Sequence, residues 1–205
     1  LPKSQVAVAE PKTLEQNKSI VVVSLEEFLR KEIPPTEKII SWMHQQSLSM
    51  IYAWRGIGKT QVALGISYAI ASGGKFLQWE AEKPHKVLYI DGELPAYWLQ
   101  DRLSRVAANN EKTAQPDYFR LITPDLQSSG LPDLATEDGQ AQLETIIGDS
   151  EVIVIDNLSC LVRGDGKENE AASWDNVQRW ALRQRSLGKS LLFIHHSGKS
   201  GTQRG

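Results

Sequence analysis

Short apolar runs alternate with longer amphipathic stretches from residue 48 onward, and this alternation constrains the fold more than any other feature of the sequence. Each run has the length of a β-strand, and each longer stretch has apolar residues three and four positions apart, as in a helix packed on one face. Parallel strands need crossover helices of this kind, so the pattern predicts an α/β fold in three layers with a mostly parallel sheet. The predicted strands are Leu48–Ala53, Lys86–Asp91, Tyr118–Ile122, Glu151–Asp156 and Ser190–His195, and the predicted helices are Lys59–Ala71, Ala96–Ala108, Gly139–Ile147 and Ser173–Leu187.

The residues ahead of this pattern predict a leader and two short elements. Residues 1–24 are rich in Lys, Glu, Gln and Pro, which is typical of a flexible leader, so we place the domain at residues 25–205. Ser24, with Glu27 three positions later, predicts a capped helix start, and two prolines at 34 and 35 end that helix. Thr36–Gln46 carries apolar residues at helical spacing and is expected to form a second short element against the core.

Composition excludes several classes of protein. The 205-residue chain has a net charge of −2, which excludes a uniformly basic nucleic-acid coat and leaves any DNA contact to a local groove. Its one cysteine, Cys160, lies in an apolar run, so we expect a packing role for it and neither a disulfide framework nor a zinc cluster. No apolar stretch approaches the roughly 18 residues of a membrane span, and no signal peptide is recognisable. We therefore expect a cytoplasmic protein with no membrane contact.

The sequence Ala-Trp-Arg-Gly-Ile-Gly-Lys-Thr at residues 53–60 joins the first predicted strand to the first predicted helix. A phosphate-binding loop requires this context, because glycines turn backbone N–H groups inward and a helix N-terminus attracts anions. Lys59 would place a full positive charge at the β- and γ-phosphates of ATP, and Thr60 would offer a hydroxyl to Mg²⁺. Ala53 replaces the first glycine of the usual pattern, which costs little if its φ is negative. The alternative is that this Gly- and Lys-containing segment is a chance turn. The expected nucleotide-binding residues are Arg55, Gly56, Ile57, Gly58, Lys59, Thr60 and Gln61.

Asp156 ends a run of four apolar residues, as expected for an acidic residue at the carboxyl end of a buried central strand. Ligands of open α/β sheets bind at such strand ends. There Asp156 would accept a hydrogen bond from Mg²⁺-bound water or from Thr60, so we predict that Thr60 and Asp156 hold the metal. The alternative is an aspartate that only caps the following turn.

A general base must come from another strand, because Asn157 and not a glutamate follows Asp156. Glu93 comes just after the predicted strand 86–91, so it would lie at the same end of the sheet and take a proton from water that attacks the γ-phosphate. Asp91 is the rival acid, although its place at the strand terminus also suits a residue that orients the loop. The alternative for Glu93 is an acidic residue in the first turn of a helix, which the helix dipole favours and which has no catalytic role.

The last predicted strand ends in two adjacent histidines, which point to opposite faces, so that one of them can face a nucleotide. We predict that this one is His196 and group it with Glu93 and Lys59 as catalytic. The alternative is a satisfied polar residue at a strand end. Two histidines without a cysteine or a third histidine nearby make a poor metal site. Lys199 and Arg204 follow, and each taken singly is typical of a solvated surface charge.

These motifs, in this order, resemble RecA-like P-loop ATPases, especially the RepA-type replicative helicases of plasmids and related ATPases of mobile elements. The resemblance covers residues 25–205 and rests on four segments, Ala53–Thr60, Tyr89–Pro95, Val154–Leu158 and His195–Lys199. It implies a RecA-like fold, Glu93 as the base and His196 as a γ-phosphate sensor. It also implies a homo-oligomeric ring, such as a hexamer, that binds ATP between subunits and contacts single-stranded DNA. A basic residue of the neighbouring subunit completes the site in that family, and Arg204 is a candidate for it.

Three functions are compatible with the sequence. The leading interpretation is an ATP-dependent, DNA-associated motor, a replication helicase-type ATPase of a plasmid, phage or other mobile element. The second is a nucleotide-gated module that loads or recruits replication or recombination proteins without unwinding DNA. The third, a small-molecule kinase, needs an arginine-rich lid after the Asp156 strand. The arginines of that region share a helical stretch with apolar residues, which favours the exposed side of an amphipathic helix. They are Arg179, Arg183 and Arg185.

Overall fold

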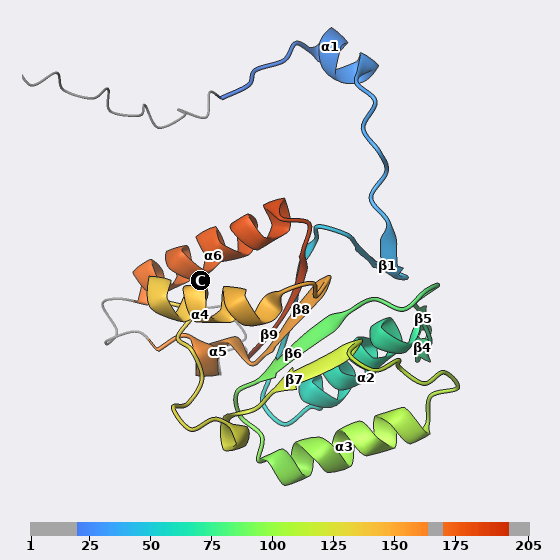
Figure 1. Ribbon diagram of the computed structural model, residues 1–205, viewed down its shortest axis with the longest axis vertical. Coiled ribbons are helices and arrows are strands. Elements are labelled where there is room, and N and C mark those ends of the chain that lie inside the picture. Colours follow the sequence, from blue (N-terminus) through green and yellow to red (C-terminus); the bar gives the residue numbers. More distant parts are fainter. Residues whose placement is uncertain (1–19, 164–169, 197–205) are drawn as a thin grey trace, which may run out of the picture. The chain divides into compact units, whose positions relative to one another are not determined.

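The computed structural model describes residues 20–163 and 170–196 of the chain (Figure 1). Two compact units, residues 1–35 and 36–205, are described here one at a time. In the first unit, helix α1 spans Leu25–Arg30. Ser24 Oγ accepts a hydrogen bond from the Glu27 N–H at 3.2 Å, and Glu27 Oε2 accepts one from the Ser24 N–H at 2.8 Å. This reciprocal capping confirms the predicted helix start.

The second unit is built on a parallel sheet of five strands in the order β3-β9-β8-β6-β7. All five predicted strands are confirmed to within one residue at either end. They are β3 (Leu48–Ala53), β6 (Val87–Asp91), β7 (Phe119–Ile122), β8 (Val152–Asp156) and β9 (Ser190–His196). The register aligns Asp156 of β8 with Asp91 of β6 and with Ile194 of β9, so the carboxyl ends of the three central strands lie side by side.

Helices cover both faces of this sheet, which gives the predicted three layers (Figure 1). The helices are α2 (Lys59–Ser72), α3 (Ala96–Ala108), α4 (Glu137–Ile147) and α6 (Glu170–Ser186), close to the four predicted ranges. Alternate residues of β8 separate the two cores, as the period of a strand requires. Val152 and Val154 pack in the core under α2 and α3, whereas Ile153 and Ile155 pack in the core under α4 and α6.

The segment 36–46 is a short element packed on the core, as predicted, but the helical spacing of its apolar residues does not produce a helix. It forms an antiparallel hairpin of β1 (Lys38–Ile40) and β2 (Met43–His44). Tertiary hydrogen bonds hold this hairpin: the Ser41 N–H donates to the Glu80 carbonyl at 3.1 Å, and the Glu80 N–H donates to Ser41 Oγ at 2.9 Å. A short segment gains little from helix propensity, so such contacts decide its structure. The apolar residues of the segment are nevertheless buried in the core, as expected.

Several short elements of the described residues were not predicted. They are the hairpin strands β4 (Lys75–Phe76) and β5 (Trp79–Glu80), the 3₁₀ turn η1 (Pro124–Leu126) and helix α5 (Leu158–Leu161). All are four residues or shorter, too short for a recognisable hydrophobic period. Within the described residues, no helix has both the length and the apolar character needed to cross a bilayer.

Candidate functional site

The loop at residues 53–60 joins β3 to α2 as predicted, and two glycines give it its shape. Gly56 and Gly58 have φ values of 82° and 93°, a left-handed conformation that favours glycine. A Cβ added at either position would meet nothing within 4 Å, so backbone conformation and not space requires glycine here. Ala53 is not among the described residues with positive φ, which explains why alanine is accommodated there. Gly58 precedes α2 and no side chain caps this helix start, so its first N–H groups have no intrahelical or side-chain cap partner.

Lys59 lies under this loop with a side chain that is almost fully buried. Its Nζ donates hydrogen bonds to the carbonyls of Ala53 at 2.8 Å and Trp54 at 2.7 Å, so it ties the start of the loop to the start of α2. Burial lowers the pKa of Lys59, while the nearby carboxylates of Asp156 and Glu93 act to raise it. Lys59 is therefore a buried cation at the centre of an otherwise acidic site.

The structure brings together the two residues predicted to hold the metal. Asp156 is hydrogen-bonded by the Thr60 hydroxyl, and its Oδ2 accepts a hydrogen bond from the Tyr89 hydroxyl at 2.6 Å. Burial raises the pKa of Asp156, and these two hydrogen bonds oppose that shift because they stabilise the ionised carboxylate. Tyr89 was not predicted to take part. In the sequence, Tyr89 is recognisable only as a residue with a hydroxyl group in an otherwise apolar strand, and this does not indicate which residue it contacts.

Glu93 and His196, the predicted base and sensor, are also in contact. His196 Nε2 lies 3.2 Å from Glu93 Oε2. Asn157 lies between them: its Nδ2 donates to Glu93 Oε2 and is 3.0 Å from His196 Nε2. Sequence analysis used Asn157 only as the place where a glutamate was missing. The adjacent His195 makes none of these contacts, and burial, followed by the charges of His196 and Lys59, lowers its pKa.

Asp91, the rival acid, supports the loop that carries Glu93. Its Oδ2 accepts a hydrogen bond from the Leu94 N–H at 3.0 Å. Burial raises the pKa of Asp91 to about 7, against the effect of hydrogen bonds from the backbone of Leu94 and Glu93. Gly92 is required here by close approach, because an added Cβ would lie 2.6 Å from Cys160 Cβ. Cys160 is thus a packing residue, and burial raises the pKa of its thiol.

The residues present fit a triphosphate with a divalent cation. The uncapped N-terminus of α2 and the left-handed glycines form a backbone cradle for phosphate, and Lys59 supplies the charge. Thr60 and Asp156 offer two oxygens, which suits a metal held mainly by phosphate and water. Among residues 20–163 and 170–196, no group of three or more His, Cys, Asp or Glu side chains forms a metal site of protein ligands alone.

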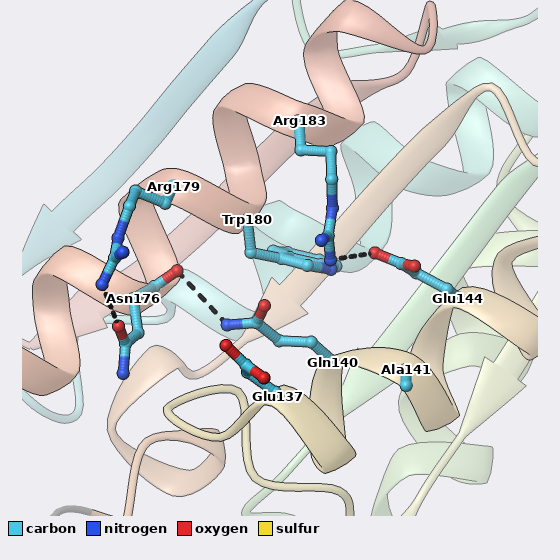
Figure 2. Close-up of a pocket in the computed structure, with 8 residues that line it drawn as sticks. All are labelled: Glu137, Gln140, Ala141, Glu144, Asn176, Arg179, Trp180 and Arg183. Atoms are coloured by element: carbon cyan, nitrogen blue, oxygen red, sulfur yellow. Dashed lines mark hydrogen bonds and ion pairs between the residues drawn. The ribbon is translucent and has the colours of Figure 1, made fainter. Parts of the chain in front are cut away.

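The arginines considered for a kinase lid belong to α6 and lie away from this site. Arg179 donates to Asn176 Oδ1 at 2.5 Å, and Arg183 pairs with Glu144 of α4 beside a pocket of about 550 Å³ (Figure 2). Arg185 donates to the Gln46 carbonyl at 2.7 Å. None of the predicted site residues lines that pocket. Lys199, Arg204 and the rest of the segment 197–205 lie outside the described residues.

A parallel sheet with a phosphate loop after β3 and acidic residues at the carboxyl ends of its central strands defines a RecA-like P-loop ATPase fold. Residues 11–202 match the AAA_25 family, described as an AAA domain, and the chain belongs to this family.

Two solved structures share the fold at low sequence identity. The flagellar accessory protein FlaH from Methanocaldococcus jannaschii aligns with 12% identity and a TM-score of 0.51 over 78% of this chain and 64% of that one. The KaiC-like protein PH0186 from Pyrococcus horikoshii OT3 aligns with 11% identity and a TM-score of 0.54 over 78% of this chain and 65% of that one. The chain therefore spans slightly less than two thirds of each of these proteins.

Proposed function

We propose that this domain hydrolyses ATP in a Mg²⁺-dependent reaction, with Glu93 as the general base. The observation that carries the proposal is the convergence of side chains from four strands at one end of the sheet. The loop after β3 brings Lys59 and Thr60, and β6, β8 and β9 bring Glu93, Asp156 and His196. Contacts join these groups into one site, although the residues are far apart in the sequence.

The phosphate loop would bind and orient the triphosphate. Backbone N–H groups at residues 56–61 would donate to the phosphate oxygens, while Lys59 would stabilise the charge that develops on the transferred phosphoryl group. Lys59 would then exchange its two carbonyl partners for phosphate oxygens. Thr60 and Asp156 would hold Mg²⁺, which supplies charge neutralisation at the β- and γ-phosphates when bound.

Glu93 would accept the proton of the attacking water, and the bond that breaks joins the γ-phosphorus to the β,γ-bridging oxygen. Its carboxylate is about half exposed, so water can reach it, and the Asn157 amide holds one of its oxygens in place. His196, next to Glu93, would contact the γ-phosphate and report its loss. The alternative roles of first-turn acid and of strand-end histidine do not account for the contact between these two side chains.

Replacement of Glu93 tests this function most directly. Glu93→Gln keeps the size and removes the basic carboxylate, so we expect unchanged Mg·ATP binding and a loss of at least roughly 10²-fold in turnover. Binding is measured by titration with a fluorescent ATP analogue, and turnover by phosphate release. Glu111→Gln, which changes an exposed glutamate away from the site, is the matched control. Parental turnover in Glu93→Gln would show that another group is the base.

The finer function that we propose is a DNA-dependent motor of the replication helicase type, from a plasmid, phage or other mobile element. Its support is the resemblance of the four sequence motifs to RepA-type helicases. In such a motor, the chain forms a ring and single-stranded DNA stimulates hydrolysis. The second candidate is a nucleotide-gated loading or regulatory module, because the fold shared with the two solved structures defines an ATPase core and not the process that it drives.

Three measurements separate the two candidates. Mass photometry with and without ATP gives the oligomeric state, and the phosphate release rate with and without single-stranded DNA gives the coupling to DNA. Strand displacement from a forked duplex measures unwinding itself. A motor requires displacement that depends on ATP and is lost in Glu93→Gln. DNA-stimulated hydrolysis without displacement would favour the module, and hydrolysis indifferent to DNA would contradict the motor.

A further inference from the structure

Tyr89 is a buried residue of β6 whose hydroxyl reaches a carboxylate on the neighbouring strand. It lies level with Val154 of β8, and Asp156 lies two residues further along β8. Two residues of a strand span about 6–7 Å, so only a long side chain that leans along the strand can bridge this distance. The Tyr89 hydroxyl bridges it and donates to Asp156 Oδ2 at 2.6 Å. The contact therefore joins the middle of β6 to the carboxyl end of β8.

The packing of the Tyr89 ring fixes the position of this hydroxyl. The side chain is fully buried, and its ring is stacked on that of Phe119 from β7, with centroids 6.1 Å apart and an interplanar angle of 19°. The torsion next to an aspartate carboxylate is soft, so Asp156 has little orientational preference of its own. A rigid donor therefore sets the position of Asp156 Oδ2, and the direction of Oδ1 follows because a carboxylate is planar.

A second buried carboxylate lies beside Asp156 and has a different donor. Asp91 is in register with Asp156 and is two residues from Tyr89 on β6, so these side chains emerge on the same face of the sheet. Asp91 Oδ2 instead accepts a hydrogen bond from the Leu94 N–H at 3.0 Å. The tyrosine hydroxyl thus serves the acid that we expect to hold the metal, whereas the backbone serves the acid that supports the loop.

We propose that Tyr89 is a positioning residue for the divalent cation: together with the Thr60 hydroxyl, its hydroxyl holds the Asp156 carboxylate in one orientation. Carboxylates that serve a metal are commonly held by such hydrogen bonds, and loss of the supporting group weakens metal binding. The inference rests on the proposed function, in which Thr60 and Asp156 hold Mg²⁺. It concerns the affinity for the cation and not the proton transfer to Glu93.

Metal affinity is measured without hydrolysis. Mn²⁺ is titrated into ADP that is fully bound to excess protein, and electron paramagnetic resonance follows the free ion. Tyr89→Phe keeps the ring and removes the hydroxyl, so we expect Mn²⁺ to bind roughly 10- to 100-fold more weakly. The affinity for ADP in EDTA should not change. Tyr68→Phe is the matched control with parental Mn²⁺ affinity expected, because Tyr68 is also buried and packs on Phe119, but its hydroxyl accepts the Ala114 N–H.

The contact itself is tested by repeating the substitution without the carboxylate. Asp156→Ala should weaken Mn²⁺ binding more than Tyr89→Phe does, and Tyr89→Phe should then add no further loss. Parental Mn²⁺ affinity in Tyr89→Phe, an equal loss in both backgrounds, or an equal loss in Tyr68→Phe would overturn the role of Tyr89 but not the metal site. Parental affinity in Asp156→Ala would contradict the metal site of the proposed function, and this inference with it. Unfolding midpoints establish that each variant is folded.

Discussion

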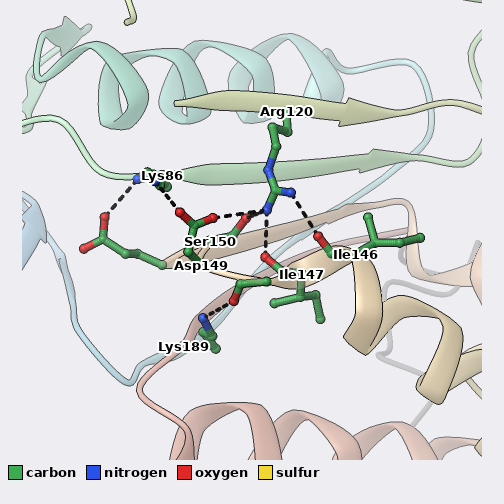
Figure 3. A network of polar contacts seen from close by, with 9 residues as sticks. Lys86, Arg120, Ile146, Ile147, Asp149, Ser150 and Lys189 are labelled. Atoms are coloured by element: carbon green, nitrogen blue, oxygen red, sulfur yellow. Dashed lines mark hydrogen bonds and ion pairs between the residues drawn. The ribbon is translucent and has the colours of Figure 1, made fainter. Parts of the chain in front are cut away.

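Both ends of the parallel sheet carry clusters of polar side chains, but the two clusters are organised differently. At the amino end, cations from the starts of several strands neutralise the carboxyl end of α4 (Figure 3). Arg120 donates to the carbonyls of Ile146 at 3.1 Å and Ile147 at 2.7 Å, and Lys189 donates to the Gly148 carbonyl at 2.8 Å. These contacts place positive charge where the helix macrodipole is negative, so they stabilise the fold.

At the carboxyl end, ionisable groups are buried although burial disfavours their charged forms. Burial raises the pKa values of Asp91 and Asp156 there and lowers that of Lys59. Asn157 Oδ1 and His196 Nδ1 are buried there without a hydrogen-bond partner, as are Ser47 Oγ and His85 Nε2 beside the amino ends of β3 and β6. Ionisable groups whose pKa values are shifted by burial are typical of sites that bind a ligand. The comparison therefore predicts that the amino end of the sheet contributes to stability and that the carboxyl end carries the proposed chemistry.

The largest expected difference between the two ends of the sheet is in ATP turnover after one lysine at each end is replaced by alanine. Lys59→Ala should abolish hydrolysis, with a loss of at least roughly 10²-fold in turnover, and strongly weaken ATP binding, because it removes the cation that is buried under the phosphate loop. Lys189→Ala, its matched control at the amino end, should leave turnover unchanged. Phosphate release and nucleotide titration measure both. Normal turnover in Lys59→Ala would remove the assignment of a phosphate site.

An intermediate effect is the pH dependence of stability, measured without divalent cations. The pKa of Asp91 is about 7 in the folded protein, above its ordinary value near 3.8, so folding favours the protonated form. The associated stability is complete below pH 3.8 and is lost as the pH rises through about 7. Between pH 5 and pH 7, the free energy of unfolding should therefore fall less in Asp91→Asn than in the parent. Urea unfolding at several pH values should give a difference on the order of 1–2 kcal/mol between the two proteins. If the free energy of unfolding changes with pH in the same way in both, the Asp91 carboxylate is more hydrated than its burial indicates.

The smallest effect is expected from the amino end. Arg120→Met keeps the aliphatic stem and removes the donors to α4, so the free energy of unfolding should fall by about 1 kcal/mol. Because Arg120 is distant from the chemistry, kcat and KM should not change. Thermal unfolding and phosphate release on the same sample measure both quantities. A change in kcat at unaltered stability would mean that the two ends of the sheet are not independent.

Local signals in the sequence predicted the five strands of the parallel sheet and most of the polar residues that meet at its carboxyl end. The strands were found because runs such as residues 152–156 are apolar on both faces, and the phosphate loop because its residues are contiguous. The helical spacing of segment 36–46 did not lead to a helix, because contacts with Glu80, distant in sequence, favour a hairpin there. Tyr89 and Asn157 were missed for the same reason, since each acts through a partner on another strand. Contacts across parallel strands leave no periodic trace in a single sequence.

The position of β3 links nucleotide binding to local unfolding. Among the described strands, β3 pairs only with β9, so the phosphate loop follows a strand with a single neighbour. Strands at such positions open at lower free energy than central ones, and their amides exchange with solvent sooner. A nucleotide bound by this loop would add its binding free energy to the closed form of β3 and β9. Nucleotide binding should therefore be detectable as slower amide hydrogen exchange along β3, at residues that do not contact the ligand.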